Sequence, residues 1–333
     1  MNEIIKVENL TKYFPVEQTF IEKLRRQNVF IKAVDGVSFS VDTGEILALV
    51  GESGCGKTTT GRLTIRLIEP TKGKIFFNNN DITLVKGRKL RELRKDLQII
   101  FQDPYASLNP RMRIGDIIAE PLIEHDLSKW NEAKQTAMNM LERVGLIPSE
   151  VFYVKYPHQL SGGQRQRVAI ARAMILKPKF VVADEPVSMI DVSLRISILE
   201  LLTSFKKEYK TSMLLITHDL GIASIIAERI AVMYLGKIVE IGPTKEVINK
   251  PAHPYTIGLL SSIPSPRKHI KKLTIIGEIA DPKNTPSGCR FHPRCPFATD
   301  KCKKEEPQLT RVSENHFAAC HYSLEIMQQY SIS

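Results

Sequence analysis

The sequence lacks the features that would place the chain in a membrane or send it through one. No uncharged apolar run reaches the roughly 18 residues that a membrane-spanning helix needs. The longest apolar stretch, from Ile222 to Leu235, is interrupted by Glu228 and Arg229. The first residues do not follow the basic, apolar and small-residue order of a signal peptide. We therefore expect the chain to reside in the cytoplasm.

The composition does not single out a partner. The chain has 333 residues, enough for one large or two ordinary domains, and its 43% hydrophobic and 25% charged content is ordinary for a globular protein. Its net charge of +11 would suit nucleic acid, an anionic membrane surface or an acidic partner, and a solvated basic face equally well. Charge alone leaves the kind of partner open.

A glycine-rich stretch from Gly51 to Thr58 fits the P-loop pattern G-x-x-x-x-G-K-[ST]. The apolar run 46–50 predicts a buried strand before it, and residues 58–68 have helical spacing after it. The glycines let backbone N–H groups face phosphate oxygens, and the helix adds the positive end of its dipole. We expect Lys57 to reach the β- and γ-phosphates and the Thr58 hydroxyl to ligate Mg²⁺. The predicted phosphate-binding residues are Gly51, Ser53, Gly54, Cys55, Gly56, Lys57, Thr58 and Thr59.

Two further apolar runs end in polar side chains. Residues 180–183 precede Asp184 and Glu185, the Walker B arrangement, in which Asp184 would hold Mg²⁺ through water and Glu185 would polarise the attacking water. The alternative is a pair of carboxylates that caps the next helix. Residues 213–217 predict another buried strand, which ends at His218. At the carboxyl end of a parallel sheet, His218 is a candidate sensor of the γ-phosphate.

A helical block interrupts this alternating α/β pattern. Helical spacing runs from Ile114 to about Leu176, most clearly over 130–144, and predicts an inserted helical subdomain. Its last helix opens at Leu-Ser-Gly-Gly-Gln, where Ser161 is a natural N-cap and two glycines leave bare N–H groups. Chemically this is a second anion site, although such a cap is often purely structural.

Four of the five cysteines fall in the last 45 residues. In a reducing compartment this clustering favours a metal site over disulfides. The spacing lacks the Cys-x-x-Cys pairs of structural zinc and differs from ferredoxin runs, so a [4Fe–4S] cluster, zinc and unligated thiols stay open. His292 and His321 are possible substitute ligands for zinc. The predicted metal ligands are Cys289, Cys295, Cys302 and Cys320.

Together these motifs resemble those of the ATPase subunits of ABC transporters, over roughly residues 1–254. The resemblance implies that Tyr13 stacks on the adenine, that Gln102 is the Q-loop ligand of Mg²⁺, and that Asp191 is the D-loop aspartate. It also implies that Lys57, Glu185 and His218 are catalytic. The signature residues, which would complete the ATP site of a second subunit, are Ser161, Gly162, Gly163 and Gln164.

Within that family the sequence is similar to the oligopeptide/dipeptide importers, and more to their second ATPase component. The supporting strings are FQDPYASLNPR at 101–111, PAHPYT at 251–256 and the cysteine-bearing tail. The resemblance implies peptide cargo, with oligosaccharides or nickel as alternatives, and favours a [4Fe–4S] cluster over zinc. One departure is the D-loop, Ser188-Met-Ile-Asp191, where the family usually has Ser-Ala-Leu-Asp.

The implied fold class is an α/β P-loop NTPase of the ABC type. Its nucleotide-binding domain covers residues 1–245, with a helical subdomain at about 103–177, and a metal-binding extension covers 246–333. The implied partners are a second ABC ATPase subunit (a paralogue or a second copy), two membrane permease subunits and, indirectly, an extracytoplasmic binding protein, with no nucleic acid. The chain would then sit on the inner face of the membrane.

Two rival functions are weighed against this one. A soluble ABC ATPase acting on DNA or ribosomes commonly has two cassettes or a long coiled coil, whereas this chain has one copy of each motif and no sustained heptads. A module that holds nucleotide without hydrolysing it is disfavoured by the presence of Glu185 and His218.

Overall fold

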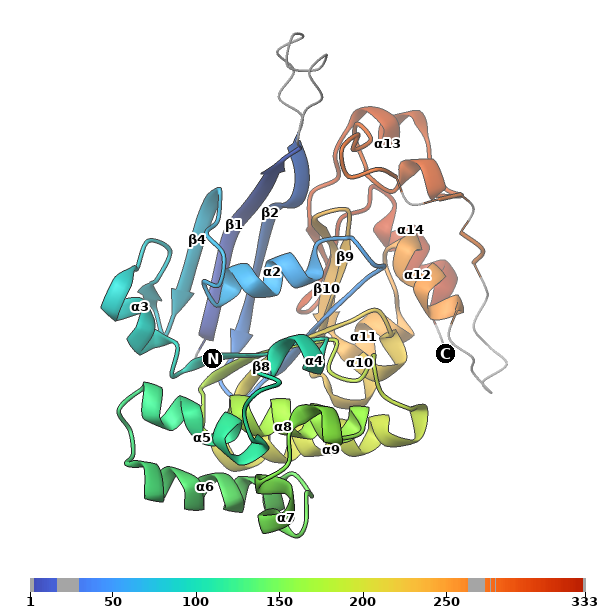
Figure 1. The fold of residues 1–333 in the computed structure, drawn as a ribbon. Helices are drawn as coiled ribbons and strands as arrows, with labels where there is room; N and C mark the ends of the chain where they lie inside the picture. The colour runs from blue at the N-terminus through green and yellow to red at the C-terminus, as the bar shows by residue number, and fades with distance from the viewer. Residues whose placement is uncertain (1–2, 17–29, 263–272, 276, 279, 332–333) are drawn as a thin grey trace. The chain divides into compact units, whose positions relative to one another are not determined.

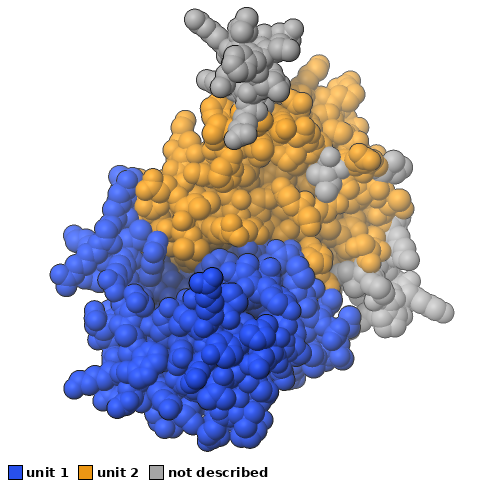
Figure 2. Space-filling model, in the orientation of Figure 1, with its two compact units in different colours: residues 1–4, 41–45, 84–216 blue, residues 5–40, 46–83, 217–333 orange. Residues whose placement is uncertain are grey.

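The computed structural model describes residues 3–16, 30–262, 273–275, 277–278 and 280–331. The chain forms two compact units, coloured separately in Figure 2. Unit 1 comprises residues 1–4, 41–45 and 84–216, and unit 2 comprises residues 5–40, 46–83 and 217–333. Each unit is therefore built from segments that lie far apart in the sequence.

Unit 2 contains most of an antiparallel sheet with the strand order β2-β1-β4-β5 (Figure 1). Ile5 pairs with Phe77 and Val7 with Ile75, and these side chains are buried because the strands alternate apolar and polar positions. The strands are β1 (Glu3–Pro15), β2 (Phe30–Asp42), β4 (Lys72–Phe77) and β5 (Asn80–Asp81).

Five further strands of unit 2 are neighbours in the order β11-β12-β10-β9-β3. The P-loop strand β3 pairs in parallel with β9, while β10 pairs antiparallel with β12. The C-terminal extension thus contributes two strands to the sheet that carries the P-loop. These strands are β3 (Ile46–Val50), β9 (Arg229–Tyr234), β10 (Lys237–Pro243), β11 (Thr310–Ser313) and β12 (His316–Ala318). The helices of unit 2 are α2 (Lys57–Thr64), α10 (Leu220–Ile226), α11 (Thr244–Asn249), α12 (Pro254–Ser261), η2 (His292–Arg294), α13 (Asp300–Lys304) and α14 (Ser323–Tyr330).

A buried carboxylate joins the extension to this sheet. Glu240 on β10 is fully buried, and its oxygens accept hydrogen bonds from the backbone N–H groups of Ala252 and His253 at 2.8 and 3.0 Å. The Nε2 atom of His316 on β12 lies 2.8 Å from Glu240 Oε1. Because a buried carboxylate needs such partners, the three segments hold one another in place.

Unit 1 contains three neighbouring parallel strands in the order β8-β7-β6. Val182 pairs with Ile99 on one side and Leu214 on the other, which explains why the central strand is apolar over residues 180–183. The strands are β6 (Leu97–Ile100), β7 (Phe180–Asp184) and β8 (Ser212–Thr217). The helices are α3 (Gly87–Leu93), α4 (Pro104–Ser107), α5 (Ile114–Glu124), α6 (Trp130–Arg143), α7 (Ser149–Tyr153), η1 (Pro157–Gln159), α8 (Gly162–Met174) and α9 (Val192–Tyr209).

The predicted helical block is present in unit 1. Helix α5 packs against α6, α7 and α8, and the four helices lie together in the green and yellow-green part of the ribbon in Figure 1. The buried residues of α6 are spaced by three and four positions, namely Ala133, Ala137, Met140 and Leu141. Among the described residues, no helix combines the length and the apolar character that a membrane crossing requires.

Candidate nucleotide-binding site

The P-loop connects β3 to α2 in unit 2, as the sequence predicts. A Cβ atom on Gly51 would lie 2.2 Å from the carbonyl oxygen of Met233, and one on Gly56 would lie 2.0 Å from that of Ala33. Gly56 also has a φ of 107°, which L-residues rarely adopt. These two glycines are therefore required by the close approach of neighbouring backbone.

Helix α2 begins directly at this loop. Its N-cap is Gly56, which has no side chain with which to cap the helix. Lys57 is 5% exposed, and its Nζ atom donates to the carbonyl oxygens of Gly51 at 2.7 Å and Glu52 at 2.9 Å. A helix N-terminus without a side-chain cap and a lysine held beside it suit a phosphate group.

Tyr13, the predicted adenine-stacking residue, lies near the end of β1. Its hydroxyl donates to Asp35 Oδ1 at 2.6 Å. Burial, together with this hydrogen bond, raises the pKa of Tyr13 to about 12. Although burial alone would raise the pKa of Asp35, the bond from Tyr13 and the charges of Arg290 and Lys237 lower it. The phenol is therefore fixed by a carboxylate that stays ionised.

Unit 1 brings the Q-loop and Walker B residues together. Asp184 is 1% exposed at the end of β7, and the next residue, Glu185, turns into a left-handed conformation with a φ of 45°. Gln102 Nε2 donates to Glu185 Oε2 at 3.1 Å. The proposed general base is thus held by the proposed Q-loop ligand, and this contact was not foreseen from the sequence.

The signature sequence begins α8 with a capping box. Ser161 Oγ accepts from the Gln164 N–H at 3.3 Å, and Gln164 Oε1 accepts from the Ser161 N–H at 3.0 Å. Gly162 and Gly163 form the first turn of the helix. The guanidinium of Arg165 donates to the carbonyl oxygen of Pro157 at 2.8 Å and lies 3.6 Å from the ring centre of Tyr105. Arg165 therefore ties the signature helix to the segment that follows Gln102.

The D-loop departure lies beside the signature. Met189 is 61% exposed, whereas Ile190 is only 6% exposed. A Cβ atom on Gly162 would lie 3.6 Å from the carbonyl oxygen of Met189, and one on Gly163 would lie 3.8 Å from Ile190 Cγ2. The D-loop therefore passes close to the signature turn, with the Met189 side chain at the surface and the Ile190 side chain buried.

The predicted site residues divide between the two units. Tyr13, the P-loop and His218, which is exposed after β8, belong to unit 2, and the Q-loop, signature and Walker B residues belong to unit 1. Each unit thus assembles its own group of the predicted residues.

The four tail cysteines are free thiols in unit 2. Burial raises the pKa of Cys295 to about 11 and that of Cys320 to about 12, and the other tail cysteines add to both shifts. Within the described part of the chain, no three or more Cys, His, Asp or Glu side chains are grouped so that they could hold a metal ion. The side chains as they stand do not fit a cluster or zinc, and the predicted metal site is not shown.

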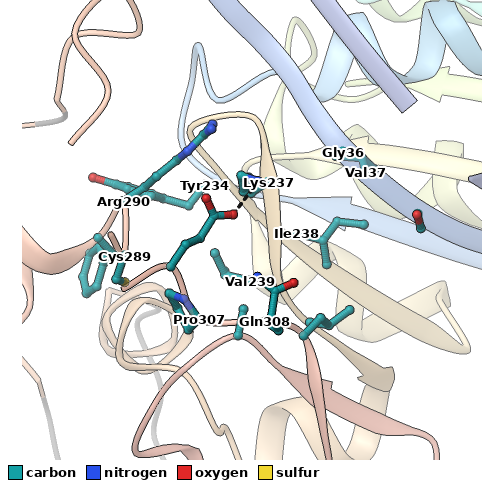
Figure 3. Close-up of a pocket in the computed structure, with 15 residues that line it drawn as sticks. Gly36, Val37, Tyr234, Lys237, Ile238, Val239, Cys289, Arg290, Pro307 and Gln308 are labelled. Atoms are coloured by element: carbon teal, nitrogen blue, oxygen red, sulfur yellow. Dashed lines mark ion pairs between the residues drawn. The ribbon is translucent and has the colours of Figure 1, made fainter. Parts of the chain in front are cut away.

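Sequence reasoning missed the residues that surround the P-loop from the C-terminal side. Arg294 donates to both carboxylate oxygens of Glu52, and Tyr255 Oη accepts from the Glu52 N–H at 2.8 Å. Tyr255 belongs to the PAHPYT string at 251–256, which indicated the family resemblance but did not predict a contact with the P-loop. A cavity of about 180 Å³ lies nearby, lined by Tyr234, Lys237 and Arg290 among others (Figure 3).

Comparisons with known proteins match two regions of the chain to described families. Residues 34–188 match the ABC transporter family, and residues 239–302 match the oligopeptide/dipeptide transporter C-terminal region. The chain is 45% identical over 323 residues to the oligopeptide transport ATP-binding protein AppF of Bacillus subtilis, covering 96% of this chain and 97% of that protein. It is 43% identical over 321 residues to the dipeptide transport ATP-binding protein DppF of Haemophilus influenzae, covering 96% of each.

Solved structures show the same fold. The dimeric ATP-binding cassette MJ0796, in a post-hydrolysis state with ADP and Pi, matches with a TM-score of 0.64 and 28% identity, covering 72% of this chain and 98% of that one. The fold is therefore that of an ABC-type P-loop ATPase with mixed sheets. The chain belongs to the ABC transporter family of ATP-binding proteins, in the branch that carries the oligopeptide/dipeptide transporter C-terminal region.

Proposed function

We infer that the chain is the ATP-binding and ATP-hydrolysing subunit of an ABC importer for peptides of the dipeptide or oligopeptide class. The observation that carries this inference is similarity along nearly the whole chain, tail included, to proteins named for oligopeptide and dipeptide transport. Oligosaccharide or nickel cargo is not favoured, because the relatives are named for peptides.

The P-loop and Walker B residues divide the chemistry. Lys57 and the N–H groups at the start of α2 would bind the phosphates, and Thr58, Gln102 and Asp184 would hold Mg²⁺, which neutralises charge on the phosphate oxygens. Glu185 would orient water for attack on the γ-phosphate, with His218 contacting that phosphate. The bond from Gln102 to Glu185 supports a link between the metal ligand and the base.

A second ATPase subunit would complete each site with Ser161, Gly162, Gly163 and Gln164. The dimeric state of MJ0796 supports this arrangement. Two permease subunits, with a binding protein beyond them, would place the chain on the cytoplasmic face of the membrane. The partner ATPase is either a paralogue or a second copy, and nucleic acid has no role.

Substitution of Glu185 tests the function directly. We expect Glu185→Gln to bind MgATP like the wild type but to hydrolyse it about 100-fold more slowly or worse, because a positioned general base contributes about 10²–10⁴-fold. The matched control is Glu200→Gln, an exposed carboxylate on α9. Both should be measured in the transporter and in the isolated subunit. Hydrolysis by Glu185→Gln at near the wild-type rate would refute the assignment.

We propose residues 1–245 as the nucleotide-binding domain, with its helical subdomain at about 103–177, and residues 246–333 as the extension. For the extension we retain a [4Fe–4S] cluster, or zinc, as a prediction. The hydrogen bond from the Cys289 N–H to the carbonyl oxygen of Cys302, at 2.8 Å, supports the proximity of two of these cysteines, whereas the absence of a ligand-like grouping among the described residues counts against a metal site. Anaerobic purification with iron and zinc analysis decides: about four irons per chain support the cluster, one zinc supports the alternative, and neither metal refutes both.

A further inference from the structure

Arg294 of the C-terminal extension binds the carboxylate of Glu52 in the P-loop. Arg294 Nη1 donates to Glu52 Oε2 at 2.7 Å, and Arg294 Nη2 donates to Glu52 Oε1 at 3.0 Å. The Arg294 side chain is 9% exposed and the Glu52 side chain 26% exposed. A two-pronged bond between a guanidinium and a carboxylate fixes both position and orientation, and it is stronger where water is largely excluded.

Glu52 is held at every polar group that can position the loop. Its N–H donates to Tyr255 Oη at 2.8 Å, its carbonyl oxygen accepts from Lys57 Nζ at 2.9 Å, and its carboxylate binds Arg294. Glu52 therefore connects Arg294, Tyr255 on helix α12 and Lys57. Movement of Arg294 would therefore displace Lys57, because both side chains are hydrogen-bonded to Glu52.

A second arginine anchors the same segment beside the site. Arg290 is 8% exposed and donates to the carbonyl oxygen of Leu235 and to Asp35 Oδ2. Asp35 in turn accepts from the Tyr13 hydroxyl at 2.6 Å. Figure 3 shows Arg290, Tyr234 and Lys237 at the cavity. Lys237 forms an ion pair there with Glu306. The segment 290–294 is therefore fixed at one end to Asp35, which binds Tyr13, and at the other end to Glu52 in the P-loop.

We propose that Arg294 is a positioning residue of the ATP site, through which the C-terminal extension sets the affinity for MgATP. The proposal rests on the proposed function. The Glu52 carboxylate in the second position of a phosphate-binding loop repels a triphosphate, and Arg294 offsets that charge while it holds the loop in shape. The extension is thus a component of the nucleotide site.

Calorimetric titration of the full-length chain with MgATP tests the proposal. We expect Arg294→Gln to raise the Kd for MgATP by about tenfold, in the range typical of coupling between sites, and to lower the thermal midpoint as well, because it breaks a largely buried ion pair. The matched control is Arg311→Gln, an exposed arginine of the same extension, which should bind like the wild type. Adding Glu52→Gln to Arg294→Gln should recover most of the lost affinity, because it removes the uncompensated carboxylate.

The outcomes separate this proposal from the function on which it rests. A wild-type chain that does not bind MgATP refutes the proposed function. If the wild-type chain binds MgATP and the Arg294→Gln variant has the same Kd, only the role of Arg294 is refuted. The role is also refuted if the double variant loses as much affinity as the Glu52→Gln and Arg294→Gln variants lose together. If Arg294→Gln does not fold, Arg294→Lys replaces it: it keeps the charge but loses the two-pronged bond, so an intermediate Kd supports the proposal and a wild-type Kd overturns it.

Discussion

Two helices of this protein begin with glycines, but the glycines are there for different reasons. At α2, backbone carbonyl oxygens stand about 2 Å from where a side chain on Gly51 or Gly56 would begin. At α8, a Cβ atom on Gly162 would meet nothing closer than 3.6 Å, which is ordinary contact. The P-loop glycines are thus demanded by the fold of this chain, whereas Gly162 is not.

The caps differ in the same way. Helix α2 starts without a side-chain cap, so phosphate can take that place, whereas α8 carries its own reciprocal cap between Ser161 and Gln164. Because its own cap stabilises the start of α8, that helix needs no ligand bound by the same chain. The comparison therefore supports the proposal that the signature serves the ATP bound by a second subunit.

The largest expected effect on stability is that of a substitution at Gly56 in the P-loop. Gly56→Ala places a methyl group against the Ala33 carbonyl at positive φ, and we expect it to lower the free energy of unfolding by about 3 kcal/mol and to abolish ATP binding. The control is Gly54→Ala, where φ is also positive at 78° but no atom lies within 4 Å. It should cost about 1 kcal/mol. Equal losses by urea denaturation would show that crowding does not explain Gly56.

A smaller effect is expected at the capping box. Ser161→Ala removes the acceptor for the Gln164 N–H, and we expect it to cost about 1 kcal/mol in the free energy of unfolding. Ser161→Thr keeps a hydroxyl and serves as the control, with a loss of a few tenths. Urea midpoints of the two variants measure the difference. A Ser161→Ala variant as stable as the wild type would mean that the cap contributes nothing to α8.

The smallest effect on stability is expected at Gly162, where a substitution tests the difference between the two helix starts most directly. Gly162→Ala has room for its methyl group in a helix, so we expect stability within about 0.5 kcal/mol of the wild type or slightly above it. Hydrolysis in the assembled transporter should nevertheless fall at least about tenfold, because the methyl group blocks the approach of a partner's phosphates. An unstable Gly162→Ala variant, or a fully active one, would contradict the distinction drawn between the two helix starts.

The sequence predicted the strand, loop and helix of the P-loop and the helical block, because periodicity and glycine placement are local signals. It did not reveal the β9–β10 hairpin, in which β10 alternates only weakly, or the strands β11 and β12, which are only four and three residues long. It also missed the contacts of Arg290, Arg294 and Gln102. These join residues 55 to 255 positions apart, and no spacing rule connects a charge to a partner at such separation.

The buried carboxylate of Glu240 has a consequence for how such chains diversify. Glu240 lies on β10, and its three partners are Ala252 and His253 at the start of α12 and His316 on β12, so segments far apart in the sequence share one buried set of hydrogen bonds. Recombination that joined the front of one relative to the tail of another near residue 245 would have to preserve all of them together. We therefore expect a chimera of two relatives to fold only when Glu240 and its three partners are all retained.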